Sequence, residues 1–500
     1  MDVKKRISYD VVVVGAGNAG LVAAIEARNH GARVLLLEKG PRERRGGNSR
    51  LADGEFRVAF DKGLPDFEYL LKDSVMPKGQ IEIEPYPKDY FYADLMRVTG
   101  GLADQQWAET IVNESMSVVH WMKDQGFAGW SLDGSTMIKK DGDKLFWPSG
   151  DAVLSAGSGE TLVEGLFRIA ESKQTDILYE TAAQSFITSA DGEITGLIAR
   201  SRDGMIQIDG QAIILACGGF ESSPEMRRRY LGEGWDLLKV RGTRNNTGDA
   251  FSMALAVGAQ TCGHWGCAHA SIVSEDSSQI EAVGSNRYSY LFGIMVNTKG
   301  RRFVDEGEDF IGYTYAKMGK EVMKQPGGVA YQIFDAKVSQ LLKPEYDNVL
   351  FSECKTLETL AEEIDIDPDT LVQTVNVYNA AITSGVTFDP SKRDGLRTNG
   401  LNPDKTNWAL PIDTPPYRAF AVVCGITCSY GGLKVNKKCQ VLDTRDIPIE
   451  GLYCIGEMSG GLFYHNCPSG TGLVKGAIGG RLAAAEAVAW SSGKAPSTGP

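Results

Sequence analysis

A glycine-rich turn near the N-terminus constrains the fold of this chain more than any other stretch. An apolar, mostly β-branched run over 9–14 leads into Gly15-Ala16-Gly17-Asn18-Ala19-Gly20, and an alanine-rich helical pattern follows over 21–29. This order predicts a strand, a tight turn and a helix. A second apolar run over 33–37 ends at Glu38. The start of the chain is therefore predicted to form a complete βαβ unit.

The spacing of these glycines is typical of a turn that binds a dinucleotide. Gly15 permits the sharp bend, Gly17 lets the backbone approach a pyrophosphate, and Gly20 lets the helix pack closely on the strand. The free N–H groups at the start of the helix favour an anion there. A carboxylate at the end of the second strand, here Glu38, can bind two ribose hydroxyls. The unit alone is compatible with either NAD or FAD.

Length and charge limit the classes of protein that fit. A chain of 500 residues exceeds the ~250–300 at which a single hydrophobic core stops growing, so we expect two domains. The formal net charge of −12 argues against nucleic acid and against an anionic membrane surface as partners. No apolar run approaches the ~18 residues of a transmembrane helix, and the short, charged N-terminus enters a strand directly. We therefore expect a cytoplasmic protein with no integral membrane segment.

The nine cysteines indicate buried thiols in a reducing compartment, because their number is odd and most lie in apolar stretches. Two of them, Cys262 and Cys267, are close in sequence to His264 and His269. A structural zinc site would need a second ligand pair at the usual spacing, and this stretch lacks one. We expect no metal.

Glycine clusters recur far along the chain, and paired glycines at the end of an apolar run mark backbone that lies close to a ligand. These clusters lie near residues 46, 218, 431, 456 and 470. Between about 262 and 427 the pattern changes to aromatic residues, histidines and short strands. We expect a nucleotide-binding domain over 1–261 that resumes over 428–490, an inserted capping domain over 262–427, and a flexible tail over 491–500.

Several motifs, spread over nearly the whole chain, together resemble one flavoprotein superfamily. They are the N-terminal glycine turn, Glu38, Gly46-Gly47-Asn48-Ser49, the apolar strand 215–220, Thr247-Gly248-Asp249 and the run 451–457. In this combination they resemble the FAD-dependent fumarate reductase and succinate dehydrogenase flavoprotein superfamily. Residues 300–306 and 464–470 look most like tricarballylate dehydrogenase and related flavoproteins, and the 3-ketosteroid dehydrogenases are the second resemblance.

The resemblance implies an α/β fold. A Rossmann-like FAD-binding domain of the glutathione-reductase type, with a parallel sheet, would be interrupted by an α+β capping domain, and the substrate would bind between the two. Covalent members of the superfamily attach flavin through a histidine near the paired glycines. No histidine occurs between His30 and His120, so the resemblance implies non-covalent FAD.

The resemblance also implies a set of FAD contacts. Glu38 would hold the adenosine ribose, and Asn48 and Ser49 would contact the pyrophosphate or the flavin edge. Asp249 and Glu457 would lie at the ribityl chain. The remaining cofactor-binding candidates are Gly15, Gly17, Asn18, Ala19, Gly20, Lys39, Gly47, Ala183, Ser469, Gly472 and Leu473, of which the last two would lie at the pyrimidine end of the flavin.

The catalytic positions depart from those of fumarate reductase. The arginine that acts as its acid corresponds to Phe310 here, its substrate histidine to Cys428, and its second substrate arginine to Cys467. His269 matches the family's substrate-binding histidine within one residue. Arg418 falls where 3-ketosteroid dehydrogenases carry a catalytic tyrosine, and a cation there would bind a carboxylate or stabilise an enolate.

Several tyrosines and one further histidine are candidates for the proton transfer. Tyr313 and Tyr315 follow the position of the missing arginine and could supply an acid or base from one turn away. The resemblance places Tyr430 and the pair Tyr464-His465 at the substrate face. We therefore take Arg418, Tyr313, His465 and Tyr464 as catalytic candidates, and His269 and Tyr430 as substrate-binding candidates.

The resemblance implies an FAD-dependent oxidoreductase that forms or saturates a C–C double bond next to a carboxylate or carbonyl, with hydride transfer to or from flavin N5. A tricarballylate-like polycarboxylate is the first small-molecule substrate we expect. The loss of two carboxylate anchors favours a neutral enone or steroid-like substrate as the alternative, and a flavin-binding subunit without turnover is a third reading. No haem-attachment or iron–sulfur cysteine spacing occurs, so electrons would pass to a separate protein, quinone or small molecule.

Overall fold

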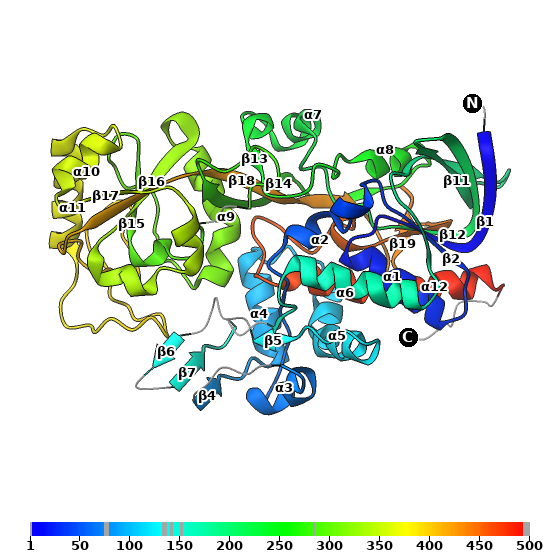
Figure 1. Ribbon diagram of the computed structural model, residues 1–500, viewed down its shortest axis with the longest axis horizontal. Helices are drawn as coiled ribbons and strands as arrows, with labels where there is room; N and C mark the ends of the chain where they lie inside the picture. Colours follow the sequence, from blue (N-terminus) through cyan, green and yellow to red (C-terminus); the bar gives the residue numbers. More distant parts are fainter. Residues whose placement is uncertain are drawn as a thin grey trace.

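The predicted βαβ unit forms the start of a large sheet (Figure 1). The computed structural model describes residues 3–74, 80–132, 138–140, 144–150, 154–283 and 286–493. β1 (Val3–Val14) and β2 (Val34–Leu37) pair in parallel, and α1 (Asn18–Asn29) joins them. The last four residues of β1 and all of β2 are buried. Burial on both faces explains why these strands are apolar runs without alternation.

Within the described residues this sheet has eight strands. Their order is β10-β11-β12-β1-β2-β9, with β20 beside β12 and β19 beside β20. The added strands are β9 (Asp176–Leu178), β10 (Ala182–Thr188), β11 (Ile194–Ser201), β12 (Gly204–Leu215), β19 (Gln440–Leu442) and β20 (Pro448–Cys454). The long β12 pairs antiparallel with β11 along its first half and parallel with β20 at 213–215. Through β20 the C-terminal part of the chain returns to the N-terminal sheet.

Helices pack closely along this sheet, where α6 (Gly159–Ser172) and α12 (Thr471–Ser491) both contact α1. α12 also packs on β12 and on α5 (Gln105–Asp124). A Cβ on Gly480 of α12 would lie 2.7 Å from the Ala19 carbonyl oxygen of α1. The glycine- and alanine-rich composition of α12 is therefore required by the short distance between the two helices.

A second sheet lies at the opposite end of the molecule from β1 (Figure 1). It consists of β13 (Lys239–Val240), β14 (Thr261–Ser274), β15 (Ile294–Asn297), β16 (Val329–Phe334), β17 (Ser352–Cys354) and β18 (Tyr417–Leu433). β18 is central, because β13, β14, β16 and β17 all pair with it. Three helices accompany this sheet, α9 (Ile311–Met323), α10 (Leu357–Glu363) and α11 (Pro368–Ala381).

The predicted division into domains stays a proposal. The second sheet includes β13, which precedes residue 262, and β18 continues through the proposed boundary at 427. β14 and β18 run from the second sheet toward the first (Figure 1). Of the proposed tail, residues 494–500 lie outside the described residues, and α12 extends to Ser491.

Between β2 and α6 the chain forms a series of short elements, several of which lie along the lower edge of the molecule in Figure 1. They are α2 (Gly47–Leu51), α3 (Leu64–Leu71), α4 (Lys88–Val98), β3 (Glu55–Phe56), β4 (Gln80–Ile83), β5 (Ser131–Leu132), β6 (Ile138–Lys140), β7 (Lys144–Trp147) and β8 (Leu154–Ser155). Two further helices, α7 (Pro224–Met226) and α8 (Asp249–Ala256), follow β12. Across the described ranges, none of the helices combines the length and the apolar character that crossing a membrane requires.

Candidate functional site

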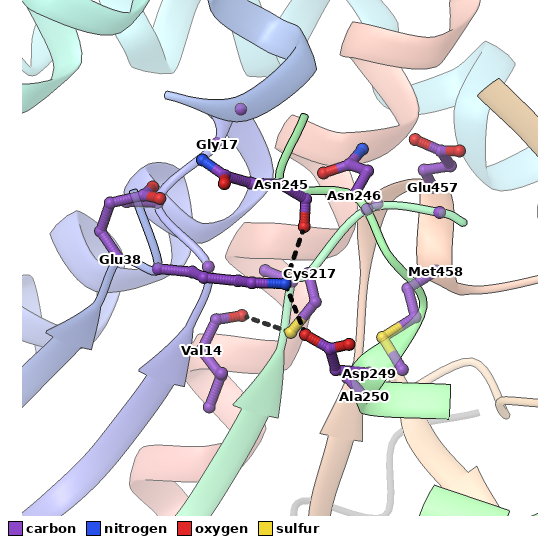
Figure 2. A pocket seen from close by; sticks show the side chains of 18 of the residues that line it. Val14, Gly17, Glu38, Cys217, Asn245, Asn246, Asp249, Ala250, Glu457 and Met458 are labelled. Carbon is purple, nitrogen blue, oxygen red and sulfur yellow. Dashed lines mark hydrogen bonds and ion pairs between the residues drawn. The ribbon is translucent and has the colours of Figure 1, made fainter. Parts of the chain in front are cut away.

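Two adjoining cavities form a cleft at the carboxyl ends of β1, β12 and β20, where ligands of such sheets bind. The first, of about 140 Å³, is bordered by the glycine turn, the residues after β2 and the start of α8. Figure 2 shows its side chains, among them Glu38, Asn245, Asp249 and Glu457. The second, of about 200 Å³, reaches the second sheet and the start of α12. Both cavities are lined by Asn18, Ala19, Asn48, Ser49, Gly456 and Glu457.

The glycine turn has the geometry that its sequence predicts. Gly15 has a φ of +105°, and a Cβ there would lie 2.4 Å from the Ala216 carbonyl oxygen. A Cβ on Gly20 would lie 1.9 Å from the Gly15 carbonyl oxygen, so Gly20 sets the close approach of α1 to the turn. Gly17 lines the first cavity directly before α1 begins. The N-terminus of α1 therefore faces the cavity, as phosphate binding requires.

One end of the first cavity carries Glu38, which is buried and whose Oε1 accepts a hydrogen bond from Gly40 N at 2.7 Å. Burial raises the pKa of Glu38, and the surrounding backbone N–H groups oppose that rise. Lys39 lies beside it, with its Nζ 2.6 Å from Asp249 Oδ2 and 2.5 Å from Thr247 Oγ1. Asp249 thus lies next to Lys39 and lines only the first cavity. Its position at the ribityl chain stays a prediction.

The junction of the two cavities contains two buried carboxyl groups. Glu457 Oε1 accepts a hydrogen bond from Ser429 N at 2.8 Å. Glu221 Oε1 accepts hydrogen bonds from Asn48 Nδ2 and Asn246 Nδ2, both at 2.5 Å. Burial raises the pKa of Glu457 to about 7, and burial together with Glu457 raises that of Glu221. Asn48 therefore lines the cleft with its amide already bound to Glu221.

The far end of the cleft lies at the start of α12, where Gly472, Leu473 and Lys475 line the second cavity. Lys475 is buried, and its Nζ donates to the Ser459 carbonyl oxygen. Burial lowers the pKa of this ammonium group. A carboxylate at one end, a helix N-terminus in the middle and a cation at the other end fit the ribose, the pyrophosphate and the electron-rich edge of the flavin in FAD.

The polar end of the second cavity contains His269 of β14. Its side chain is buried, and burial with the charges of Arg241 and Arg287 lowers its pKa to about 3, so the imidazole is neutral. The ring lies edge-on to Tyr315, with 5.0 Å between the ring centroids. Among the described residues, His269 Nδ1 has no hydrogen-bond partner. His269 thus lines the second cavity, and its role in substrate binding stays a prediction.

Arg241 follows β13 and also lines the second cavity. Its Nη2 lies 3.4 and 3.3 Å from the two carboxylate oxygens of Asp53. Asp53 also accepts hydrogen bonds from Arg287 Nη2 and, at 2.7 Å, from the Tyr288 hydroxyl. Loss of contact with bulk water opposes ionisation of the Asp53 carboxyl group. The two guanidinium groups outweigh this effect and hold the pKa of Asp53 well below its ordinary value. This cluster therefore combines two cations with one anion.

Tyr315 of α9 is a further polar side chain at the second cavity. The part of the chain that the structure describes provides no hydrogen bond to its hydroxyl, although the side chain lines the cavity. Burial raises the pKa of Tyr315, so the phenol stays protonated around neutral pH. A protonated donor at a cavity without a protein partner is suited to protonate a bound molecule.

Neutral groups also line the second cavity. The Tyr430 hydroxyl donates to Cys467 Sγ at 3.4 Å, and Cys428 lies on the same side. Burial raises the pKa of Cys467 to about 11 and raises that of Cys428 as well, so both thiols are uncharged. Cys428 and Cys467, which the resemblance aligns with a histidine and an arginine of fumarate reductase, thus add no charge to the cavity.

Four predicted catalytic residues do not reach either cavity. The Tyr313 hydroxyl donates to Asp94 Oδ2 at 2.6 Å, which fixes it as a packing residue. His465 is exposed and its ring lies 4.5 Å from that of His264, which Tyr464 also contacts.

Arg418 has a different neighbourhood from the one predicted. Its Nε donates to Glu353 Oε2 at 2.7 Å, and its guanidinium lies over the Phe351 ring. The cavity-lining part of β18 begins at Thr427, about 30 Å further along the strand at ~3.3 Å per residue. An arginine at the distal end of β18 cannot contact a substrate in this cavity.

The remaining cofactor candidates are placed as follows. Gly15, Gly17, Asn18, Ala19, Lys39, Gly47, Ser49 and Ala183 line the first cavity, and Gly472 and Leu473 the second. Gly20 packs α1 against the turn, and the Ser469 hydroxyl donates to Glu55.

Sequence reasoning missed Asp53, Arg241, Glu221 and Lys475. A signal exists for Lys475, since it is the first of only three charged residues in a glycine- and alanine-rich helix and lies in its first two turns.

Comparisons with known proteins agree with this geometry. The sequence model of a family described as "FAD binding domain" matches residues 10–473. A probable fumarate reductase of Shewanella frigidimarina is 27% identical over 489 residues, which are 95% of this chain and 74% of that protein. A vinyl phenol reductase of Lactiplantibacillus plantarum is 28% identical over 506 residues, 92% of each protein.

A solved structure agrees as well. The open conformation of a flavocytochrome c3 fumarate reductase superposes with a TM-score of 0.72 at 25% identity, covering 98% of this chain and 79% of the other. These matches confirm the superfamily and the α/β fold that the motifs predict. The chain therefore belongs to the FAD-binding family of the fumarate reductase flavoproteins, and it is an FAD-dependent oxidoreductase that acts on CH–CH groups.

Proposed function

We propose that this protein exchanges a hydride with a C–C double bond, or with its saturated counterpart, that is conjugated to one carboxylate or one carbonyl. The observation that carries the proposal is the pair Arg241 and His269. Both side chains are buried, both line the second cavity, and Arg241 Nε and His269 Nδ1 have no partner among the described residues. Polar side chains at the wall of a cavity that the protein leaves incompletely hydrogen-bonded are suited to bind an oxygen-bearing group of a ligand.

The charges of the cavity do not favour a polycarboxylate such as tricarballylate. Asp53 offsets one of the two nearby guanidinium groups, and His269 is neutral. Cys428 and Cys467 add no positive charge. Three substrate carboxylates would bring more negative charge into the cavity than these groups can balance.

A neutral substrate is the second candidate. Tyr315, Tyr430 and Phe463 provide an aromatic wall, and the matched vinyl phenol reductase is named for a substrate without a carboxylate. A flavin-binding subunit without turnover is less favoured, because the second cavity contains buried polar groups beyond those needed to hold FAD.

When FAD is bound, its flavin supplies hydride exchange at N5. Glu38 and the N-terminus of α1 hold the nucleotide half, and Lys475 with the start of α12 holds the flavin end. Arg241 binds the substrate oxygen and stabilises negative charge that develops on it. Tyr315 donates a proton to the substrate carbon in the reductive direction, and in the oxidative direction its phenolate form would accept one. The electron donor or acceptor is a separate partner, and the cytoplasmic location stays a prediction.

The reaction can be tested with photoreduced protein under anaerobic conditions. Mixing it with α,β-unsaturated monocarboxylates and enones of several sizes should reoxidise the flavin faster than fumarate or aconitate does. If no alkene reoxidises the flavin faster than buffer does, the protein does not reduce alkenes. The interpretation as a flavin-binding subunit without turnover is then correct. If fumarate or aconitate reacts fastest, the charge argument is wrong.

FAD attachment is a separate proposal. We expect the flavin to remain in the supernatant after acid precipitation, because covalent members use a histidine that this chain lacks near Gly47. Yellow colour that stays in the washed pellet would contradict it.

Replacing Glu38 with alanine should weaken FAD binding about ten- to a hundredfold. The reason is that a hydrogen bond to a charged group contributes ~1.5–3 kcal/mol, and a factor of ten corresponds to ~1.4 kcal/mol. Titration of apoprotein with FAD, followed by flavin fluorescence, measures the change. Glu43→Ala serves as the control, since Glu43 is exposed in the following loop. Equal affinities of the two variants would remove the ribose assignment.

A further inference from the structure

Asp53 presents its carboxylate to the second cavity while the two arginines lie behind it. The Asp53 side chain is 41% exposed, whereas those of Arg241 and Arg287 are 7% and 2% exposed. Asp53 lines the second cavity. A buried guanidinium needs an anion nearby, and here the protein provides that anion from its own chain, on the loop after α2.

Arg241 is held only loosely by this carboxylate. The two distances from its Nη2 to the Asp53 oxygens, 3.3 and 3.4 Å, exceed the ~2.7–2.9 Å of a strong charge-assisted hydrogen bond. Within the described residues Asp53 is the sole side-chain partner of Arg241, and Arg241 Nε has none. The guanidinium group of Arg241 therefore still has an N–H group without an acceptor. The Asp53 carboxylate occupies the position of a second acceptor beside Nη2.

We propose that Asp53 determines how many carboxylates a substrate of this cavity can have. Its own carboxylate takes the position beside Arg241 and Arg287 that a second substrate carboxylate would occupy. The cavity then accepts one carboxylate or carbonyl and rejects dicarboxylates by repulsion between like charges. The inference rests on the proposed function in one respect, namely that the second cavity binds the substrate.

Asp53→Asn tests this inference without requiring turnover. The amide keeps the size of the side chain and removes its charge, so Arg241, which lines the cavity, loses its carboxylate partner and can bind a second substrate carboxylate. Succinate and butyrate are the probes, because they have the same carbon chain and differ by one carboxylate. Their dissociation constants are measured from the absorbance change of the oxidised flavin. We expect the preference for succinate over butyrate to rise at least tenfold relative to wild type.

A preference that changes less than threefold in an FAD-loaded, folded Asp53→Asn protein would overturn the inference. Asp53→Ser removes the same charge with a smaller side chain and must shift the preference in the same direction. Asp309→Asn is the matched control, since Asp309 is a buried carboxylate bound to Arg97 at 2.7 Å and lines neither cavity. Its preference should equal that of wild type.

The outcome is separable from that of the proposed reaction. If the preference shifts as expected while wild type reduces no alkene, the role of Asp53 stands and the proposed function fails. If wild type reduces monocarboxylates while the preference does not shift, the function stands and the role of Asp53 fails.

Discussion

Replacing Tyr315 with phenylalanine should lower kcat about 10²- to 10⁴-fold, the usual contribution of a general acid. The variant loses only the hydroxyl of this cavity-lining side chain, and the edge-on ring contact with His269 at 5.0 Å remains. FAD binding and flavin reduction by dithionite should be unchanged, because neither step requires the phenolic proton. Stopped-flow measurement of flavin reoxidation by substrate isolates the affected step.

Tyr313→Phe is the matched control for this variant. The Tyr313 hydroxyl is bound to Asp94 and lines neither cavity, so its loss should lower the melting temperature and leave kcat of the FAD-loaded enzyme unchanged. A further check uses pH. Because burial raises the pKa of Tyr315 above its ordinary value of 10.0, alkene reduction should persist at a pH where an exposed tyrosine ionises. Equal kcat losses in both variants would rule out Tyr315 as the specific donor.

Replacing Arg241 with alanine should lower kcat/KM about 10²- to 10³-fold, the cost of removing one donor to a developing oxyanion. Asp53 keeps Arg287 and Tyr288 as partners in this variant, so no carboxylate is left unpaired. Initial rates at varied substrate concentration give the change in kcat and KM separately.

Arg418→Ala is the control, because Arg418 also pairs with a carboxylate, Glu353, but lies away from the cavities. Its kcat/KM should match wild type. An Arg418 variant as impaired as the Arg241 variant would contradict the placement of substrate in the second cavity. It would restore the role that the resemblance to 3-ketosteroid dehydrogenases implies.

Local sequence was sufficient to predict the βαβ unit that lines the first cavity. Gly15 and Gly20 act through contacts within the turn and with the adjacent strand, and Glu38 follows β2 directly. The whole unit spans one strand, one helix and one strand, so short-range pattern specifies it. The glycine- and alanine-rich α12 was likewise readable, because close packing against α1 demands small side chains.

The sequence did not predict which side chains of a helix, or which end of a strand, face the substrate cavity. Tyr313 and Tyr315 are two positions apart on α9, which places them ~200° apart around the helix. The sequence singled out both tyrosines but not which of them lines the cavity. Arg418 and Thr427 share β18, and only the position of that strand relative to the first sheet decides which end reaches the flavin.

The sequence by itself determined that the chain binds FAD through a βαβ turn and belongs to the fumarate reductase flavoproteins. The tertiary structure alone decided the polar end of the substrate cavity, where Asp53, Arg241 and Arg287 meet from distant parts of the chain. The physical reason is that a turn specifies its own geometry through neighbouring residues. A balance of charges in a buried cavity depends on groups that only folding brings together.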